Sequence, residues 1–268
     1  MARISRLNKL SEPEKKSIYR LLIPDKVFKL FEIDAETGLN KNGQQVVWCE
    51  CPPGSAEGTV EVKSHPEDVD PIYYIEVADA KDLLQLYWYF IQVNDIRVPR
   101  INTDITPDGQ SRWLFWDLRN VPEEERALKA GLAPGQVRPG LRLTDDVNQC
   151  LDRFCSTLGI LSIYMEALFY HTAIAFERNG FRYLRGGEKM SLINKEFQPG
   201  GRLYQMLDGR NIFRQREFYN TVRGRSWAIH DGILDDLADP EIGKWVPPKM
   251  YRMVEMRHEI NSCPEGCW

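Results

Sequence analysis

Residues 45–63 read QVVWCECPPGSAEGTVEVK, and this stretch indicates how the front of the chain folds. Segments 45–51 and 59–63 alternate apolar with other residues, which is the two-residue period of a β-strand that buries one face. Residues 52–58 between them are rich in Pro and Gly, which favour reversal of the chain. The stretch therefore predicts two antiparallel strands joined by a turn.

The alternating pattern recurs on both sides of this pair. A third run, IYYIEV at residues 72–77, extends the pair into an antiparallel meander. Asp108-Gly109 is a typical hairpin turn with an apolar arm on each side. The aromatic and β-branched content of residues 83–93 favours a strand over a helix. Further strands are predicted at residues 26–33, 101–105 and 112–118.

Helix signals stand before and after the predicted strands. Ser11-Glu-Pro-Glu14 combines a capping serine, acids in the first turn and a proline that is tolerated there, so a helix is expected from Ser11 to about Leu22. Residues 122–131 predict a short helix with acids at its head and Gly131 at its end.

Beyond residue 143 the apolar period changes from two residues to 3.6. Val147, Leu151, Phe154 and Leu158 form an amphipathic stripe that predicts a helix from residue 144 to 158. Residues 160–179 are apolar on nearly every face and predict a single buried helix. A last helix is expected at about residues 250–260.

These patterns predict an α+β protein. The N-terminal half is expected to be antiparallel and β-rich, like a sandwich or barrel, and the C-terminal half to be rich in helices. We divide the chain into a β-rich part (residues 1–132), a Pro/Gly linker (133–143) and a helix-rich part (144–268). The two parts are expected to pack as one globular unit.

Composition and charge limit the classes of partner. The net charge is −4 and the isoelectric point about 5.7, so no overall field attracts nucleic acid or anionic membranes, and neither is a predicted partner. No window approaches the run of about 20 apolar residues that crosses a bilayer, and no secretory signal is found. The six cysteines are therefore expected to be reduced thiols of a cytoplasmic protein. The composition leaves the oligomeric state open.

Common cofactor motifs are absent from the sequence. The chain contains no dinucleotide fingerprint, P-loop, HExxH or GxSxG motif. Residues 176–181, FERNGF, resemble the helix end before a late strand in N-acetyltransferases of the GNAT type. The Gly-rich pyrophosphate loop of that family is not found upstream and a long segment follows, so we assign no family.

Histidines and carboxylates suggest a reaction centre. Glu166 and His171 lie in the apolar segment 160–179, where an unpaired polar group costs several kcal/mol. One helix cannot bring them together, so partners must come from elsewhere: His230-Asp231, or Glu255 and His258, whose spacing puts both on one helix face. Buried hydrogen bonds of Glu166 and His171 to loop backbone are the alternative. The ligands predicted for a divalent transition metal are His171, His230, His258 and Glu255.

A segment rich in arginine suggests an anion site. Residues 200–226 contain six arginines and no lysine. Arginine binds carboxylates and phosphates with two parallel hydrogen bonds, so Arg214, Arg223 and Arg225 are predicted to bind a small anionic molecule. The alternative is ion pairing with acids of the same chain. Arg223 and Arg225 lie seven and five positions before His230, which begins the only His-Asp dipeptide of the chain.

The sequence thus favours a cytoplasmic enzyme that acts on a small carboxylate or phosphate substrate. In this hypothesis His230 is the general base or a metal ligand, Asp231 or Glu166 orients it, and the arginines hold the substrate. One alternative is a non-catalytic sandwich or barrel protein whose aromatic residues at 87–90 and 113–116 line an apolar ligand pocket. Another is a structural subunit of a complex, with the arginine segment and the cysteines of 263–267 in the interface.

Overall fold

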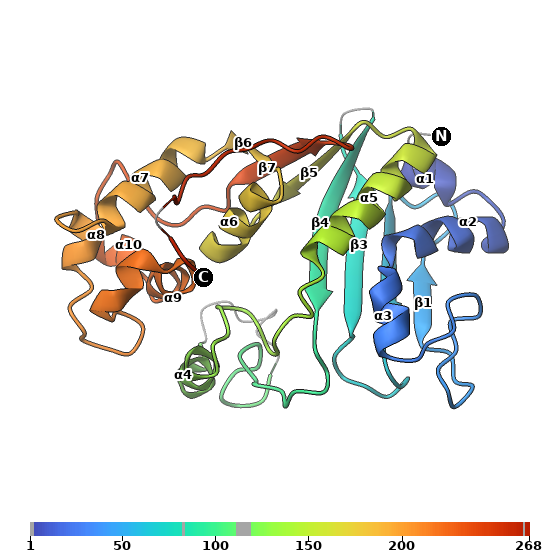
Figure 1. The fold of residues 1–268 in the computed structure, drawn as a ribbon, viewed down its shortest axis with the longest axis horizontal. Helices are drawn as coiled ribbons and strands as arrows, with labels where there is room; N and C mark the ends of the chain where they lie inside the picture. Colours follow the sequence, from blue (N-terminus) through green and yellow to red (C-terminus); the bar gives the residue numbers. More distant parts are fainter. Residues whose placement is uncertain (1–2, 82–83, 111–118, 265) are drawn as a thin grey trace. The chain divides into compact units, whose positions relative to one another are not determined.

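In a computed structural model of the protein, the structure describes residues 3–81, 84–110, 119–264 and 266–268. The chain forms two compact units (Figure 1). Unit 1 comprises Met1–Val98, Gly140–Met165 and Tyr251–His258, and unit 2 comprises Pro99–Pro139, Glu166–Met250 and Glu259–Trp268. The chain passes from unit 2 to unit 1 at Pro139 and Gly140, inside the predicted linker. The division into residues 1–132 and 144–268 stays a prediction.

The described strands form one mostly antiparallel sheet, in the order β1-β2-β3-β4-β5-β7-β6. Neighbours are antiparallel from β1 to β4, and β4 pairs with β5 in parallel. The predicted α+β class and the meander are confirmed. The sheet is not closed, because β1 and β6 end the order, so a barrel or sandwich is not confirmed. The strands are β1 (Val47–Glu50), β2 (Glu57–Val62), β3 (Tyr73–Asp79), β4 (Gln85–Val93), β5 (Ser162–Glu166), β6 (Arg182–Arg185) and β7 (Lys249–Met253).

Alternation along β2 and β3 sets the register of the meander. Val60 lies opposite Ile75 and Val62 lies opposite Tyr73, and all four side chains are buried. A slip of one residue would turn these side chains toward the opposite face, so burial fixes the pairing. The meander is therefore the part of the fold that follows most directly from the apolar pattern.

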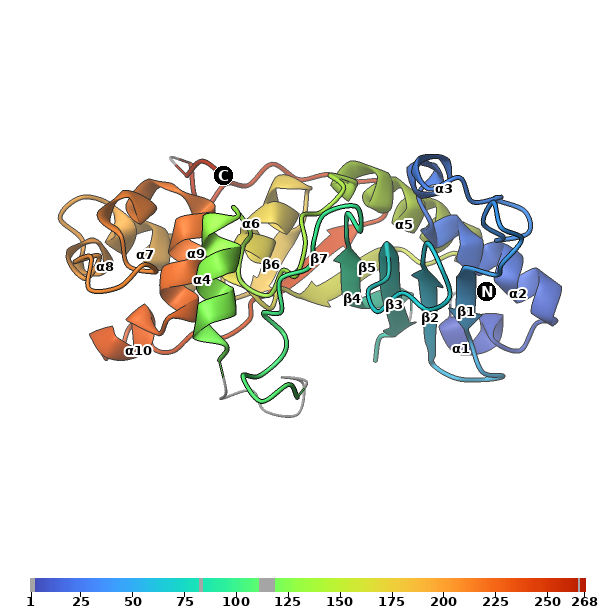
Figure 2. The same ribbon diagram turned by 90° about the horizontal axis from the view of Figure 1, so that it is seen from below.

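Helices cover both faces of the meander in unit 1. Figure 2 shows α3 (Asp25–Leu30) and α5 (Thr144–Leu158) on one face of the strands and α1 (Ile4–Leu7) on the other. The helix predicted from Ser11 is present as α2 (Glu12–Tyr19), which continues into the 3₁₀ turn η1 (Arg20–Leu22). The Ser11 N–H donates to Glu14 Oε2 at 3.1 Å, as in a capping box.

The strand predicted at residues 26–33 is wrong, because this segment forms α3. Val27 and Phe28 are both buried, although they are adjacent in sequence. Successive residues of a strand point to opposite faces, whereas neighbouring residues of a helix can share one broad apolar stripe. The β-like pattern of residues 26–33 is therefore too short to distinguish a strand from a helix.

The predicted helix at 144–158 is confirmed as α5, which ends at Gly159 with φ +75°. The single helix predicted at 160–179 is wrong: β5 is followed by a turn and then by α6 (Tyr170–Arg178). The strand and the helix are both buried, so a run without clear periodicity fits either structure. The helix predicted near 250–260 is also wrong, since β7 occupies Lys249–Met253.

Unit 2 consists mainly of helices. The short helix predicted at 122–131 is α4, and Gly131 beyond its end has φ +82°. The GNAT-like segment forms the end of α6, after which Phe181 is buried and β6 begins. The helices of the unit in the described residues, besides α6, are α4 (Val121–Lys129), α7 (Gly187–Phe197), α8 (Arg202–Gln205), η3 (Arg216–Asn220), α9 (Val222–His230) and α10 (Ile233–Leu237).

Part of the predicted second hairpin lies outside the described residues. The turn itself is present: Gly109 has φ +86°, and the Thr106 N–H donates to the Gln110 carbonyl at 2.7 Å. The arm at 112–118 and the aromatic residues at 113–116 fall in the part that is not described. In the described ranges, no helix has the length and apolar character needed to span a membrane.

Candidate active site

A histidine and a glutamate meet between α4 and α9. Nε2 of His230, the last residue of α9, lies 2.9 Å from Oε1 of Glu124 in the first turn of α4. Figure 2 shows the two helices side by side. Trp227 of α9 is fully buried and donates from Nε1 to the Leu132 carbonyl at 2.8 Å, which fixes α9 against the end of α4.

Glu124 is held in its ionised form. Its side chain is buried, and burial by itself would raise the pKa. Hydrogen bonds from His230 and Arg119 outweigh burial and lower the pKa of Glu124 to about 2. Nε of Arg119 donates to Glu124 Oε2 at 2.7 Å. At neutral pH Glu124 is therefore a buried carboxylate, with Arg119 and His230 among its partners.

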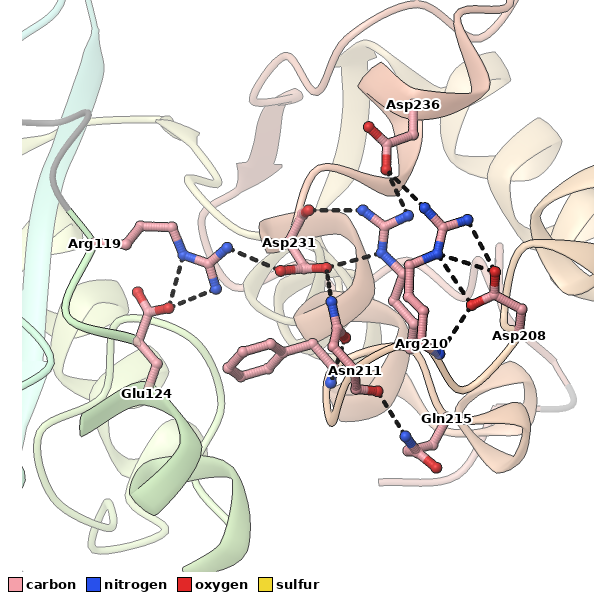
Figure 3. Close-up of polar contacts among 10 residues, drawn as sticks. Arg119, Glu124, Asp208, Arg210, Asn211, Gln215, Asp231 and Asp236 are labelled. Atoms are coloured by element: carbon pink, nitrogen blue, oxygen red, sulfur yellow. Dashed lines mark hydrogen bonds and ion pairs between the residues drawn. The ribbon is translucent and has the colours of Figure 1, made fainter. Parts of the chain in front are cut away.

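Asp231 occupies the centre of a second group of polar contacts (Figure 3). Its carboxylate accepts hydrogen bonds from Arg119 Nη1 at 2.9 Å, Asn211 Nδ2 at 2.9 Å and Arg214 Nε at 2.8 Å. Burial opposes ionisation, but these donors lower the pKa of Asp231. Arg119 thus connects the two carboxylates, Glu124 and Asp231.

The arginines around Asp231 also have other acidic partners. Nη1 of Arg214 lies 2.7 Å from Asp236 Oδ2, and Arg210 pairs with Asp208 at 2.9 Å. Arg214 is buried, and it pairs with both Asp231 and Asp236. Its charge is already balanced inside the protein, as the ion-pairing alternative expects.

A second histidine lies near His230. His171 is buried, and burial together with the charge of His230 lowers its pKa to about 3. It is therefore neutral at pH 7, and its Nδ1 lies 2.9 Å from Ser226 Oγ. The ring centroid of Phe169 is 5.6 Å from that of His171 and 6.1 Å from that of His230. Two imidazoles thus pack against one aromatic ring.

The structure brings His230 and Asp231 to the same cluster, but their hydrogen-bond partners differ from those expected. His230 is bonded to Glu124, whereas Asp231 holds arginines. Glu166, the other predicted catalytic carboxylate, lies in β5 and pairs with Lys249 at 2.9 Å. Neither predicted carboxylate bonds to the His230 ring, and Glu124 takes that position.

The predicted metal centre is not supported. Within residues 3–81, 84–110, 119–264 and 266–268, no three His, Cys, Asp or Glu side chains come together in a way that could hold a metal ion. Glu255 and His258 belong to unit 1, and the hydroxyl of Ser156 donates to Glu255 Oε1 at 2.9 Å. They do not share a helix, since β7 ends at Met253. His171 and His230 are both bonded to non-metal partners.

The three predicted anion-binding arginines have different surroundings. Arg223 is exposed, and its Nη1 donates to the Gly131 carbonyl at 2.8 Å. Arg225 is completely buried and donates from Nη1 to Asn194 Oδ1 at 2.6 Å. Arg214 pairs with Asp231 and Asp236. Each is bonded to other acceptors of the chain, so the contacts favour a structural role over an anion site.

Sequence reasoning missed Glu124 and Arg119. Glu124 was visible only as one of several acids at the head of a helix, where acids are favoured by the helix dipole. It is 106 positions away from His230, and no local pattern marks that pairing. Comparison of the chain with protein-family models, curated proteins and solved structures finds no match.

Proposed function

We propose that the protein is an enzyme in which His230 is the general base and Glu124 orients it. The observation that carries the proposal is the 2.9 Å contact between His230 Nε2 and the buried Glu124 carboxylate. Because Glu124 is ionised, Nε2 carries the proton, and the lone pair of the ring is on Nδ1. This arrangement fixes the tautomer that a general base needs.

The free nitrogen supports a role in proton transfer. Nδ1 of His230 makes no hydrogen bond to any described residue, and the side chain is 16% exposed. When Nδ1 takes a proton from an O–H or N–H of a bound molecule, the imidazolium forms beside the Glu124 carboxylate, which stabilises it. Arg119 keeps Glu124 ionised and in place throughout the step.

The substrate that we propose is a small molecule, and we do not propose that it is an anion. Arg214 pairs with Asp231 and Asp236, and Arg225 is completely buried with its Nη1 bonded to Asn194, so we do not assign either arginine to a carboxylate or phosphate substrate. We propose no metal ion in the reaction, because the described residues include no group of three His, Cys, Asp or Glu side chains that could bind one. The cytoplasmic location stays a prediction.

The proposal is tested by comparing metabolite conversion by the wild type and His230→Gln. Each purified protein is incubated with a metabolite extract, and the compounds that change are identified by untargeted mass spectrometry. The wild type is expected to convert at least one compound at a rate that depends on pH, and the variant to lose about 10² to 10⁴-fold of it at an unchanged melting temperature.

The matched control is His65→Gln, which replaces a half-exposed histidine of unit 1 and is expected to keep full conversion. Glu124→Gln is expected to reduce conversion less than His230→Gln, because the amide still accepts a hydrogen bond but stabilises the imidazolium less well. Equal conversion by the wild type and His230→Gln, or none by either, would contradict the proposal.

A further inference from the structure

The last cysteines of the sequence occupy very different positions in unit 2. Cys263 is completely buried, whereas Cys267 is exposed. The Gly266 N–H donates to the Cys263 carbonyl at 3.2 Å, so the chain turns back between the two cysteines. Both thiols are free.

The sulfur of Cys263 touches the backbone next to Cys267. A Cβ atom added at Gly266 would lie 2.2 Å from Cys263 Sγ, well inside van der Waals contact. Only glycine leaves room for the sulfur at this place. The buried Cys263 thiol therefore packs directly against Gly266, the residue before the exposed Cys267.

Cys267 is held by backbone hydrogen bonds. Its N–H donates to the Asn220 carbonyl at 3.0 Å, and its carbonyl accepts from the Val222 N–H at 2.7 Å. These bonds fix Cys267 beside the start of α9. The two cysteines are thus held close together by the fold of unit 2 as well as by their short spacing in sequence.

An arginine without an acidic partner lies on the other side of Cys263. Arg225 Nη1 donates to Cys263 Sγ at 3.0 Å, and the side chain is 0% exposed. No carboxylate of a described residue pairs with Arg225, and its Nη2 has no hydrogen-bond partner among those residues. The guanidinium thus holds the Cys263 sulfur in place beside Gly266.

We propose that Cys263 and Cys267 form a thiol–disulfide site that reacts with a small disulfide and closes into an intramolecular disulfide. The Cys267 thiolate attacks one sulfur of glutathione disulfide, forms a mixed disulfide and releases glutathione thiolate. Cys263 then loses its proton to water and attacks the Cys267 sulfur, which expels the second glutathione thiolate. Two protein thiols are oxidised, and one glutathione disulfide is reduced to two thiols.

The order of attack follows from exposure. Glutathione disulfide reaches the exposed Cys267, but it cannot reach the buried Cys263 in the folded protein. Cys263 is therefore the resolving cysteine. Because Cys263 Sγ accepts from Arg225 Nη1, closing the disulfide is expected to alter this contact of α9.

The test treats the full chain with glutathione disulfide, quenches with iodoacetamide and identifies the products by peptide mass spectrometry. In the wild type, a Cys263–Cys267 disulfide is expected to form and to be reversed by dithiothreitol. In Cys263→Ser, a stable glutathione adduct is expected on Cys267. In Cys267→Ser, Cys263 is expected to stay reduced for at least ten times longer than in the wild type.

Cys155 is the internal control, because it is buried and is expected to stay unmodified in all three proteins. Two results would overturn the proposal. One is a glutathione adduct on wild-type Cys267 that never closes onto Cys263. The other is oxidation of Cys263 at the same rate in Cys267→Ser as in the wild type. Replacing the exposed Cys267 leaves the core intact, so the second comparison does not depend on a destabilised protein.

Discussion

The meander of unit 1 and the polar cluster of unit 2, which joins His230, Glu124, Arg119 and Asp231, are stabilised differently. In the meander, Val60 packs opposite Ile75, and any apolar side chain of similar size would satisfy its neighbours. In the polar cluster, the His230 ring pairs with one particular carboxylate, that of Glu124. Apolar burial is not directional, whereas a buried charge requires a partner at one distance and angle. The comparison predicts different responses to mutation.

The largest effect is expected for Glu124→Ala. The substitution removes the acceptor of His230 and of Arg119 at once, and loss of one partner of a buried pair costs about 3–5 kcal/mol. The free energy of unfolding is measured with urea, with backbone amide exchange in α9 as a probe of unit 2. The control is Glu125→Ala, a partly exposed residue of the same helix, expected within about 0.5 kcal/mol of the wild type. If Glu124→Ala and Glu125→Ala lower the free energy of unfolding equally, the pair of His230 and Glu124 does not stabilise unit 2.

A graded loss is expected for Ile75 in the meander. Ile75→Ala removes a fully buried side chain and is expected to cost about 2–5 kcal/mol, whereas Ile75→Val is expected to cost about 0.5–1.5 kcal/mol. Amide exchange in β2 and β3 reports the loss in unit 1. The cost should scale with the volume removed. A Val variant as unstable as the Ala variant would contradict this account of the meander.

A pH effect is expected to separate the two regions further. The pKa of Glu124 is about 2 in the folded protein and near 4.5 when the chain is unfolded. Its contribution of about 3 kcal/mol is therefore complete above pH 4.5 and lost as the pH falls toward 2. Amide exchange of α4 and α9 is measured across this range for the wild type and Glu124→Gln. Glu124→Gln should not lose this stability as the pH falls. If stability falls equally with pH in the variant and the wild type, the loss does not come from Glu124.

The smallest effect is expected for a local contact of unit 2. Thr221 caps α9, and its Oγ1 accepts from the Gly224 N–H at 3.1 Å. Thr221→Ala is expected to cost about 1 kcal/mol, and Thr221→Ser to restore most of it. Urea unfolding compares these variants with Glu124→Ala. If loss of the cap costs as much as loss of Glu124, local structure rather than the long-range pair stabilises this region.

The sequence by itself determined the elements whose signals are local. The capped helix at Ser11, the meander from β1 to β4 and the stripe of α5 follow from period, turn residues and caps. The predicted secondary structure was wrong where one sequence pattern fits both a strand and a helix. Residues 160–179 lack a clear period, and residues 26–33 alternate over too short a run to separate strand from helix.

Only the tertiary structure decided which polar groups meet. The sequence identified His230-Asp231 as a lead, but the bond to Glu124 and the bridging role of Arg119 connect positions more than 100 residues apart. The contact between Arg225 and Cys263 also joins residues that are distant in sequence, 38 positions apart. Hydrophobic patterning is repeated along the chain and can be recognised in a short window, whereas a polar partner is a single residue placed by the packing of distant helices.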